Sequence, residues 1–347
     1  MRRGIPARRG VWVALLLSLA LIAAACGGAG GSATTTAGVT TTTAAQGTAT
    51  TAAADNQVSQ KDLEFDLIFH DKDASGTFWG VMKNGLDDAC AAQGVSCTMI
   101  GDPDITKQVA LVDTSIANDV DGIILTLPNV DALRDAIQRA ADAGIPVVTI
   151  NSGSDVFATT AAIAHVGQDE FIAGQGAGKR LAANGATNIL CVIHEANNAA
   201  LQARCDGVEA GAGDVTVKRI QIDVANLDAA FETIKTAVSD SSIDAVITLN
   251  PDVSIRARDA IAEAGSTATL ATFDLGEEVL NSIEAGTIQF AVDQQQYLQG
   301  FLPVVQLVLY LQSGLVIGGG QAILTGPGFV DASNVAQVKA GVAAGTR

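Results

Sequence analysis

The stretch PVVTINSGSD, residues 146–155, decides how we expect the chain to be organised. Its first part, residues 147–150, consists of apolar and β-branched side chains, which predicts a short buried strand. The strand runs out at Asn151, where small and polar residues predict a turn. Similar strand–helix units lie before and after this stretch. We therefore expect Asn151 to contact a ligand and residues 153–157 to carry the chain from one lobe to another.

Alternating strands and helices continue along the chain on both sides of this stretch. Each predicted strand is short and nearly all apolar, which is typical of strands covered by helices on both faces. Strands alternating with helices of this length indicate βαβ units and parallel sheets. The predicted strands are residues 65–70, 95–101, 122–127, 146–150, 163–166, 188–193, 215–222, 244–249, 269–273 and 287–292. The predicted helices are residues 77–92, 106–118, 130–143, 170–183, 199–210, 227–239, 254–264, 277–285 and 297–312, and residues 321–330 look extended again.

The number of these units predicts an α/β fold of two doubly wound parallel-sheet lobes joined by a hinge. There are too many units for one compact open sheet, and they lack the eightfold regularity of a TIM barrel. We expect an N-terminal lobe of residues 61–156 plus 293–320 and a C-terminal lobe of residues 157–292 plus 321–347. In such sheets, ligands bind beyond the carboxyl ends of the strands.

The N-terminal segment is typical of an export signal. Four arginines within residues 1–9 precede a short apolar run at residues 11–25. Small residues then lead to Cys26, a pattern that resembles the bacterial lipobox, whose cysteine is lipid-modified; an ordinary secretory signal with an incidental cysteine is the alternative. Residues 1–25 would be a lipoprotein signal peptide, and residues 26–60, rich in Thr, Ala and Gly, a flexible tether. We expect an exported protein that is lipid-anchored to the outer face of the cell membrane.

The charge of the chain limits its partners. The 347 residues have a formal net charge of −17 at pH 7. Removal of residues 1–25, which carry four Arg and no acid, leaves 16 Lys and Arg against 37 Asp and Glu, a net charge of −21. Such an acidic surface argues against nucleic acid and against anionic membranes as partners, and it leaves the lipid anchor as the expected membrane attachment.

Four cysteines follow the predicted signal: Cys90, Cys97, Cys191 and Cys205. An even number in an exported chain suggests disulfides, for which three connectivities exist. Proximity in sequence favours Cys90–Cys97 and Cys191–Cys205. Neither pair has the CxxC spacing or the nearby His of a metal site, so we expect structural disulfides.

Polar side chains follow most of the predicted strands. Carboxylates, amides and a guanidinium form paired hydrogen bonds with neighbouring hydroxyl groups, and aromatic rings cover the apolar C–H faces of a sugar ring. Phe78 and Trp79 lie at the start of the first predicted helix. The polar candidates are Asp102, Asn151, Gln168, Arg204, Asn250, Asp274 and Gln294.

Structural roles are the alternative for several of these residues. Asn and Asp favour the N-cap position of a helix, which would account for Asn151, Asn250 and Asp274. Arg204 could be a surface residue that pairs with Asp206 or Glu209. Phe78 and Trp79 could pack in a core, although adjacent helix positions do not easily face the same core. We therefore expect one of the two rings to face the cleft.

Six motifs occur in a specific order: the Phe–Trp pair, VGQDEFIAGQGAG (166–178), RxxG (204–207), the Asn after DAVITL, the Asp in TFDLG (272–276), and DQQQYLQG (293–300). In this order the chain resembles the type I periplasmic substrate-binding proteins of ABC importers, in the ribose-binding-like group of simple-sugar receptors. The resemblance covers roughly residues 65–330.

The resemblance implies a role for each matching position. Phe78 and Trp79 would sandwich the sugar ring, and four residues would bind its hydroxyl groups: Arg204, Asn250, Asp274 and Gln294. Asn151 lies where the family often has an Asp–Arg pair, and Ser152 takes the place of that Arg. Asp102 and Gln168 are further candidate contacts.

Other motifs do not lead to a catalytic site. Gly174, Gly176 and Gly178 fall inside a predicted helix rather than at its start, which argues against dinucleotide binding. Gly174 and Gly178 share one face of that helix, so we expect them to allow close helix–sheet packing. The three histidines, His70, His165 and His194, are scattered and have no metal-site spacing or nucleophile elbow. We expect no cofactor, no metal and no enzymatic activity.

These observations predict a monomeric solute receptor. It would bind a monosaccharide or polyol in the interlobe cleft, close about its hinge, and deliver the ligand to ABC permease subunits. A sugar-sensing co-receptor for a membrane signalling or chemotaxis partner is the alternative. The identity of the sugar or polyol stays open.

Overall fold

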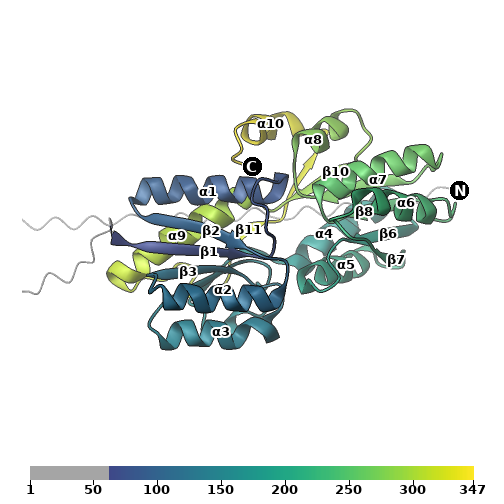
Figure 1. Cartoon of the computed structure of the whole chain (residues 1–347). Coiled ribbons are helices and arrows are strands. Elements are labelled where there is room, and N and C mark those ends of the chain that lie inside the picture. The colour runs from purple at the N-terminus through teal and green to yellow at the C-terminus, as the bar shows by residue number, and fades with distance from the viewer. Residues whose placement is uncertain (1–61) are drawn as a thin grey trace, which may run out of the picture. The chain divides into compact units, whose positions relative to one another are not determined.

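Two six-stranded sheets form the fold of residues 62–347, the part of the chain that the computed structural model describes (Figure 1). The predicted signal peptide, the lipidation site at Cys26 and the predicted tether lie outside the described residues. Neighbouring strands are parallel except for one antiparallel pair, β10 and β12. The first sheet has the order β11 (Ile323–Gly326), β5 (Ala164–Gln168), β4 (Val147–Asn151), β3 (Gly122–Thr126), β1 (Glu64–Phe69), β2 (Ser96–Gly101). The second has the order β12 (Gly328–Asp331), β10 (Phe290–Asp293), β9 (Thr269–Phe273), β8 (Ala245–Thr248), β6 (Asn188–Ile193), β7 (Thr216–Gln221).

Helices cover both faces of each sheet, which explains why the central strands β3 and β4 are buried at every position. The first sheet packs against α1 (Thr77–Gln93) and α9 (Gln296–Ser313) on one face and α2 (Ile105–Ala117) and α3 (Val130–Asp142) on the other. The second packs against α4 (Glu170–Ala183) and α5 (Ala199–Ala212) on one face. Its other face is covered by α6 (Leu227–Val238), α7 (Pro251–Glu263), α8 (Glu277–Glu284) and α10 (Val335–Ala343). The predicted α/β fold of two parallel-sheet lobes is confirmed.

The lobe boundaries predicted from sequence are wrong at two places. β5 was expected to open the second lobe, but it pairs with β4 in the first sheet, with Asn151 opposite Gly167. β11 also belongs to the first sheet, where it pairs with β5. An apolar strand pattern shows that a strand is buried but not which sheet it joins. The sequence therefore placed the start of the second lobe one strand too early.

The chain therefore passes between the sheets at three positions: after β5, after β10, and between β11 and β12. These crossings put the first lobe at residues 62–168 and about 294–326, and the second at the remainder of the described chain. The predicted crossing at residues 153–157 is instead a turn that leads into the short 3₁₀ helix η2 (Phe157–Thr159). Among the described helices, none is both long enough and apolar enough to span a membrane.

Gly174 and Gly178 of α4 serve helix–helix packing, so the helix–sheet role expected for this pair is wrong. A Cβ atom at Gly174 would lie 2.1 Å from the carbonyl oxygen of Arg204 on α5, and one at Gly178 would lie 2.1 Å from that of Val208. Only glycine allows the two backbones to approach this closely. The disulfides Cys90–Cys97 and Cys191–Cys205 are both present, and the second fixes α5 to β6.

Candidate functional site

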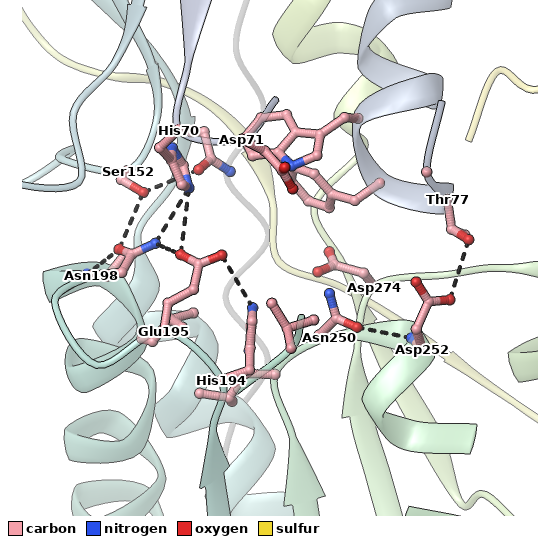
Figure 2. A pocket seen from close by; sticks show the side chains of 18 of the residues that line it. His70, Asp71, Thr77, Ser152, His194, Glu195, Asn198, Asn250, Asp252 and Asp274 are labelled. Atoms are coloured by element: carbon pink, nitrogen blue, oxygen red, sulfur yellow. Dashed lines mark hydrogen bonds and ion pairs between the residues drawn. The ribbon is translucent and has the colours of Figure 1, made fainter. Parts of the chain in front are cut away.

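Residues that follow the carboxyl ends of strands in both sheets line a cavity of about 160 Å³ (Figure 2). The first lobe contributes the segment after β1, the start of α1 and the end of β4. The second lobe contributes the segments after β6, β7, β8 and β9 and three residues of α5: Ala200, Leu201 and Arg204. Six of the nine residues selected from sequence line it: Phe78, Trp79, Asn151, Arg204, Asn250 and Asp274.

Arg204 is buried and is held in one orientation by Glu170. The Nε and Nη2 atoms of Arg204 donate to the two carboxylate oxygens of Glu170 at 2.6 and 3.0 Å, and Nη1 donates to the carbonyl of Leu249 at 3.2 Å. Burial alone would lower the pKa of Arg204, but the carboxylates of Glu170, Asp274 and Glu195 together outweigh burial and raise it. The surface role considered for Arg204 is absent, because Arg219 pairs with Asp206 and Glu209 instead.

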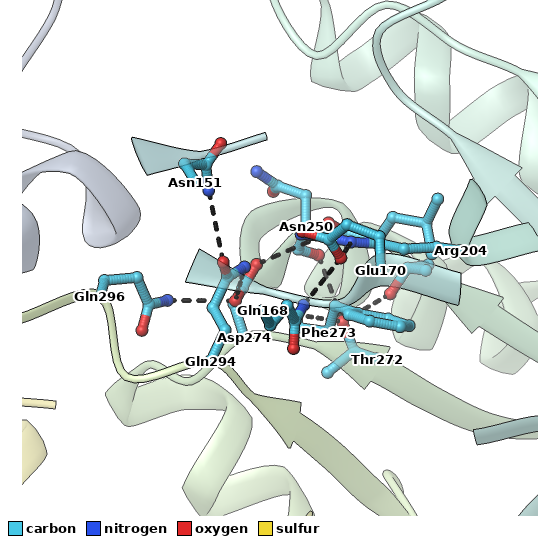
Figure 3. A network of polar contacts seen from close by, with 12 residues as sticks. Asn151, Gln168, Glu170, Arg204, Asn250, Thr272, Phe273, Asp274, Gln294 and Gln296 are labelled. Carbon is cyan, nitrogen blue, oxygen red and sulfur yellow. Dashed lines mark hydrogen bonds and ion pairs between the residues drawn. The ribbon is translucent and has the colours of Figure 1, made fainter. Parts of the chain in front are cut away.

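Asp274 lies at the centre of a buried polar network that joins both lobes (Figure 3). Gln294 and Gln296 donate to its Oδ1 atom at 2.7 and 3.1 Å. Its Oδ2 atom lies 4.0 Å from Nη1 of Arg204. Burial raises the pKa of Asp274 to about 7, although Arg204 and the bond from Gln294 act in the opposite direction. The Oδ2 atom is thus the oxygen that a ligand hydroxyl would meet.

Asn151 connects the first lobe to the same network. Its Nδ2 atom donates to Oε1 of Gln294 at 3.3 Å, and its Oδ1 atom accepts from the hydroxyl of Ser152 at 3.0 Å. Asn151 has a φ of 62° and is the last residue of β4 rather than a helix cap. Asn tolerates this left-handed conformation better than most residues. The helix-cap alternative therefore does not hold for Asn151.

The cap alternative is correct for Asn250. Its Oδ1 atom accepts from the backbone N–H groups of Asp252 and Val253 at 2.9 and 3.1 Å and thereby caps α7. The cap uses the side-chain oxygen, so the amide nitrogen is the group left for a ligand. Asp274 does not cap a helix, because Gly276 holds the N-cap position of α8.

Phe78 and Trp79 form a corner instead of two parallel plates. Their ring centroids lie 4.7 Å apart with an angle of 83° between the planes. Trp79 is buried and packs on Phe69, whereas Phe78 is only partly buried. The ring of Trp79 thus belongs mainly to the core and that of Phe78 is more accessible. This difference is expected because adjacent helix positions face different directions. The expected sandwich of a sugar ring between the two is wrong in geometry.

Three selected residues do not line the cavity. Gln294 donates to Asp274, which lines the cavity, whereas Gln168 donates at 2.8 Å to Glu170, which is outside the cavity lining and holds Arg204. Asp102 follows the edge strand β2 and lies outside the cavity. Its carboxylate accepts from the backbone N–H of Asp104 and pairs with Lys107 at 3.1 Å.

Sequence reasoning missed a polar cluster across the two lobes. The histidines considered scattered include two that flank Glu195: His70 Nε2 lies 3.7 Å and His194 Nε2 lies 3.8 Å from its carboxylate oxygens. Asn198 donates to Glu195 at 2.8 Å and lies 3.4 Å from His70. His70 follows β1 and His194 follows β6, so the strand-end rule applied to both lobes would have found them. Burial lowers the pKa of both histidines, that of His194 to about 4.

The family follows from a comparison with known proteins. The model of the periplasmic binding protein domain matches residues 68–315. The chain belongs to this family. Its two α/β lobes have the type I periplasmic binding protein fold, and the family consists of binding proteins, in agreement with the prediction of a receptor rather than an enzyme.

Individual members of the periplasmic binding protein family are similar over most of the described chain. A carbohydrate transporter from Acidothermus cellulolyticus 11B, whose crystal structure is a complex with myo-inositol, is 39% identical; the match covers 82% of this chain and 100% of that one, with a TM-score of 0.80. The xylose/arabinose-binding protein XylF of Sulfolobus acidocaldarius is 26% identical over 299 residues, 78% of this chain and 71% of XylF. A solute-binding protein from Burkholderia graminis in complex with D-arabinose shares the fold, with 20% identity, a TM-score of 0.70 and coverage of 80% and 98%.

Within residues 62–347, no group of three or more His, Cys, Asp or Glu side chains is arranged to hold a metal ion. The cavity instead combines hydrogen-bonding groups with an aromatic face, which suits a small hydroxylated ligand.

Proposed function

We propose that this protein is an extracytoplasmic solute receptor that binds a monosaccharide or polyol in the cavity between its lobes and delivers it to an ABC importer. The observation that carries the proposal is the convergence of Arg204, Asp274, Asn250 and Asn151 from four separate elements beside the partly buried ring of Phe78. The 39% identical carbohydrate transporter with bound myo-inositol supports a cyclic polyol as one candidate.

Each polar group has a direct role toward a hydroxylated ring. Asp274 would accept from a hydroxyl group through Oδ2, while Nη1 of Arg204 and the amide nitrogen of Asn250 would donate to hydroxyl oxygens. Vicinal hydroxyl groups would thus bridge Arg204 and Asp274, whose facing atoms are 4.0 Å apart. Phe78 would cover an apolar C–H face of the ring.

The charge of the cavity favours a ligand without negative charge. Five carboxylates line it, and its one guanidinium is already paired with Glu170. An anionic ligand such as a sugar phosphate or a uronic acid would meet net repulsion. Neutral pentoses, hexoses and cyclitols fit this environment.

Hinge closure would couple binding to delivery. The ligand groups come from both lobes, so a ligand makes its full set of hydrogen bonds only when the lobes are together. The lobes already contact each other directly: Gln294 donates to Asp274 at 2.7 Å, Asn84 donates to the carbonyl of Gly345 at 2.9 Å, and Thr77 Oγ1 lies 3.4 Å from Asp252 Oδ1. A bound ligand would add its own hydrogen bonds to both lobes and so favour the closed state further.

Isothermal titration calorimetry of the purified protein against myo-inositol, D-xylose, D-arabinose and D-allose tests this function. We expect binding of at least one of these compounds and none of glucose 6-phosphate or glucuronate. Binding of amino acids or nucleosides with no response to any sugar or polyol would reject the proposal. Uptake of the labelled ligand into vesicles that contain the cognate permease would then test delivery, with the co-receptor role as the alternative outcome.

The attachment to the membrane is part of the same proposal. Lipid modification of Cys26 would tether a monomeric receptor to the outer face of the membrane through residues 26–60. Labelling cells with a fatty-acid probe should mark the wild-type protein and leave the Cys26→Ala variant unmarked. Equal labelling of both would reject the anchor without affecting the ligand proposal.

A further inference from the structure

Residues 344–347 follow α10, which packs on the second lobe, and lie beside α1 of the first lobe (Figure 1). They border a groove of about 560 Å³ between the lobes. Thr77 and Lys83 line this groove from α1, and Val342 and Arg347 line it from the second lobe. The segment thus reaches from one lobe to the surface of the other, so its contacts depend on how far apart the lobes are.

The carbonyl oxygen of Gly345 bridges the lobes, because it accepts a hydrogen bond from Nδ2 of Asn84 on α1 at 2.9 Å. Gly345 has a φ of 67°, and a Cβ atom at this position would lie 2.5 Å from Nδ2 of Asn84, so glycine is needed for this approach. The backbone N–H groups of Gly345 and Thr346 donate to the carbonyls of Val342 and Gly341 at 3.0 and 2.9 Å, which fixes the segment to the end of α10. Separation of the lobes would therefore break the bond from Asn84.

Arg347 anchors the same segment at the hinge. Its Nε atom donates to Oδ2 of Asp293 at 2.7 Å, and Asp293 is fully buried as the last residue of β10, where the chain crosses between the lobes. The Oδ1 atom of Asp293 accepts from the backbone N–H of Gln295 at 2.9 Å, and Gln295 has a φ of 54°. Hinges absorb backbone rotation at a few residues in such positions, at the ends of elements. Arg347 thus supplies the charge that compensates a buried carboxylate within the crossing.

We propose that residues 344–347 are a latch that holds the lobes together before a ligand binds. This inference rests on the hinge closure of the proposed function. The bond from Asn84 exists only while the lobes are together, and Arg347 keeps the crossing at Asp293 in the conformation that it has in the closed arrangement. A larger closed fraction raises the affinity for the ligand, because the apparent Kd is the intrinsic Kd divided by the fraction of binding-competent protein. The latch thus sets how readily the empty receptor adopts its closed state.

Spin labels on the two lobes test the latch without any ligand. Asp131→Cys on α3 and Asp228→Cys on α6 place the labels at exposed positions, and a Cys26→Ala background leaves only disulfide-bonded cysteines besides these two. We expect double electron–electron resonance to show mainly the short interlobe distance for this labelled parent, and an about threefold larger share of the long distance after Asn84→Ala. Asn84 is exposed on a helix, where Ala is favourable, so the variant should fold normally.

Ligand affinity gives the second readout, with myo-inositol and D-xylose as the calorimetric probes. Asn84→Ala should weaken their binding by about two- to tenfold. Arg347→Gln should have a similar effect, and Arg347→Lys, which keeps the charge, should restore part of the loss. Lys339→Ala is the matched control on α10, because it breaks an ion pair with Glu284 that lies within the second lobe. It should change neither the interlobe distances nor the affinity.

Identical distance distributions for Asn84→Ala and its labelled parent would overturn the latch and leave the proposed function intact. A ligand-free parent that shows only the long interlobe distance would also overturn it. Failure of every sugar and polyol to bind would instead reject the proposed function, and the distances, measured without ligand, would still decide whether the latch holds the lobes together.

Discussion

The carboxylate of Glu170 on α4 accepts two hydrogen bonds, of 2.6 and 3.0 Å, from the guanidinium of Arg204 on α5. Both side chains are buried, and the pair is possible because the glycines of α4 bring the two helix backbones into contact. The bidentate geometry leaves Arg204 only one direction for its remaining nitrogen, toward Leu249 and Asp274. The orientation of the cavity's one guanidinium is thus set before any ligand arrives.

Loss of Glu170 should therefore destabilise the fold strongly. Glu170→Ala leaves an uncompensated charge in the interior, which costs on the order of 3–5 kcal/mol of unfolding free energy. Urea denaturation followed by circular dichroism measures it. Glu209→Ala, which breaks an exposed ion pair with Arg219, is the matched control and should cost about 1 kcal/mol or less. Equal effects of the two variants would contradict the structural importance of the buried pair.

Asp274→Asn should weaken binding of the sugar or polyol and preserve the fold. The substitution removes the charge that accepts a ligand hydroxyl, which corresponds to about 1.5–3 kcal/mol, roughly ten- to a hundredfold or more in affinity. Asn is preferable to Ala here because Asp274 has a φ of 70°, a conformation that Asn adopts more readily. Asp102→Asn, outside the cavity, should bind like the wild type, and the melting temperature checks folding. An Asp274→Asn variant with unchanged affinity would show that Oδ2 does not contact the ligand.

Phe78 and Trp79 should separate binding from stability. Phe78→Ala removes the more accessible ring and should lower affinity by about 0.5–1.5 kcal/mol with a small effect on unfolding. Trp79→Ala empties a core position and should cost about 3–5 kcal/mol of unfolding free energy. Calorimetric titration and urea denaturation of both variants provide the comparison. The reverse ranking would mean that Trp79 is the ring that contacts the ligand.

His165 makes the stability of the protein sensitive to acid. This residue is buried in β5, and burial lowers its pKa to about 3 from an unfolded value of 6.5. The unfolded chain therefore binds this proton more readily, so the stabilising contribution is complete above pH 6.5 and is lost as the pH falls toward 3. At pH 5 the loss is about 2 kcal/mol.

A comparison with His165→Gln isolates this effect. Asp274, whose pKa is raised to about 7, acts in the opposite sense, because its contribution becomes more favourable as the pH falls from 7 toward 4. The difference in unfolding free energy between wild type and variant should therefore shrink by about 2 kcal/mol between pH 7.5 and pH 5, although the wild type alone shows less. A difference independent of pH would mean that His165 does not titrate between the two states.

The order of strands and helices was predictable because the central strands are buried on both faces and stand out as short apolar runs. Eight of the first nine helices begin within one residue of the predicted position, and only α7 starts earlier, at Pro251 after the cap at Asn250. α10 was missed because its Val- and Ala-rich sequence has little amphipathic pattern. The pairing of β5 was not predictable, since long-range strand pairing leaves no local signature.

The site was predictable where one residue follows one strand. Asn250 and Asp274 were found by this rule, and both line the cavity. His70, His194 and Glu195 were missed although the same rule covers them, because the histidines were examined only for metal and nucleophile spacing; only the contact of His70 with Glu195 requires the two lobes to be together. Asp102 also follows a strand but does not line the cavity, because the end of an edge strand lies away from the centre of the cleft.

The placement of β11 has a consequence for the order in which the protein is built. The first sheet includes residues 323–326, so this lobe lacks its outer strand until almost the whole chain is available. Until then β5 presents an unpaired edge, the kind of surface that promotes aggregation of partly synthesised chains. The second lobe likewise waits for β12. Neither lobe can complete its sheet before residues 323–331 are available, so the two lobes are completed almost together.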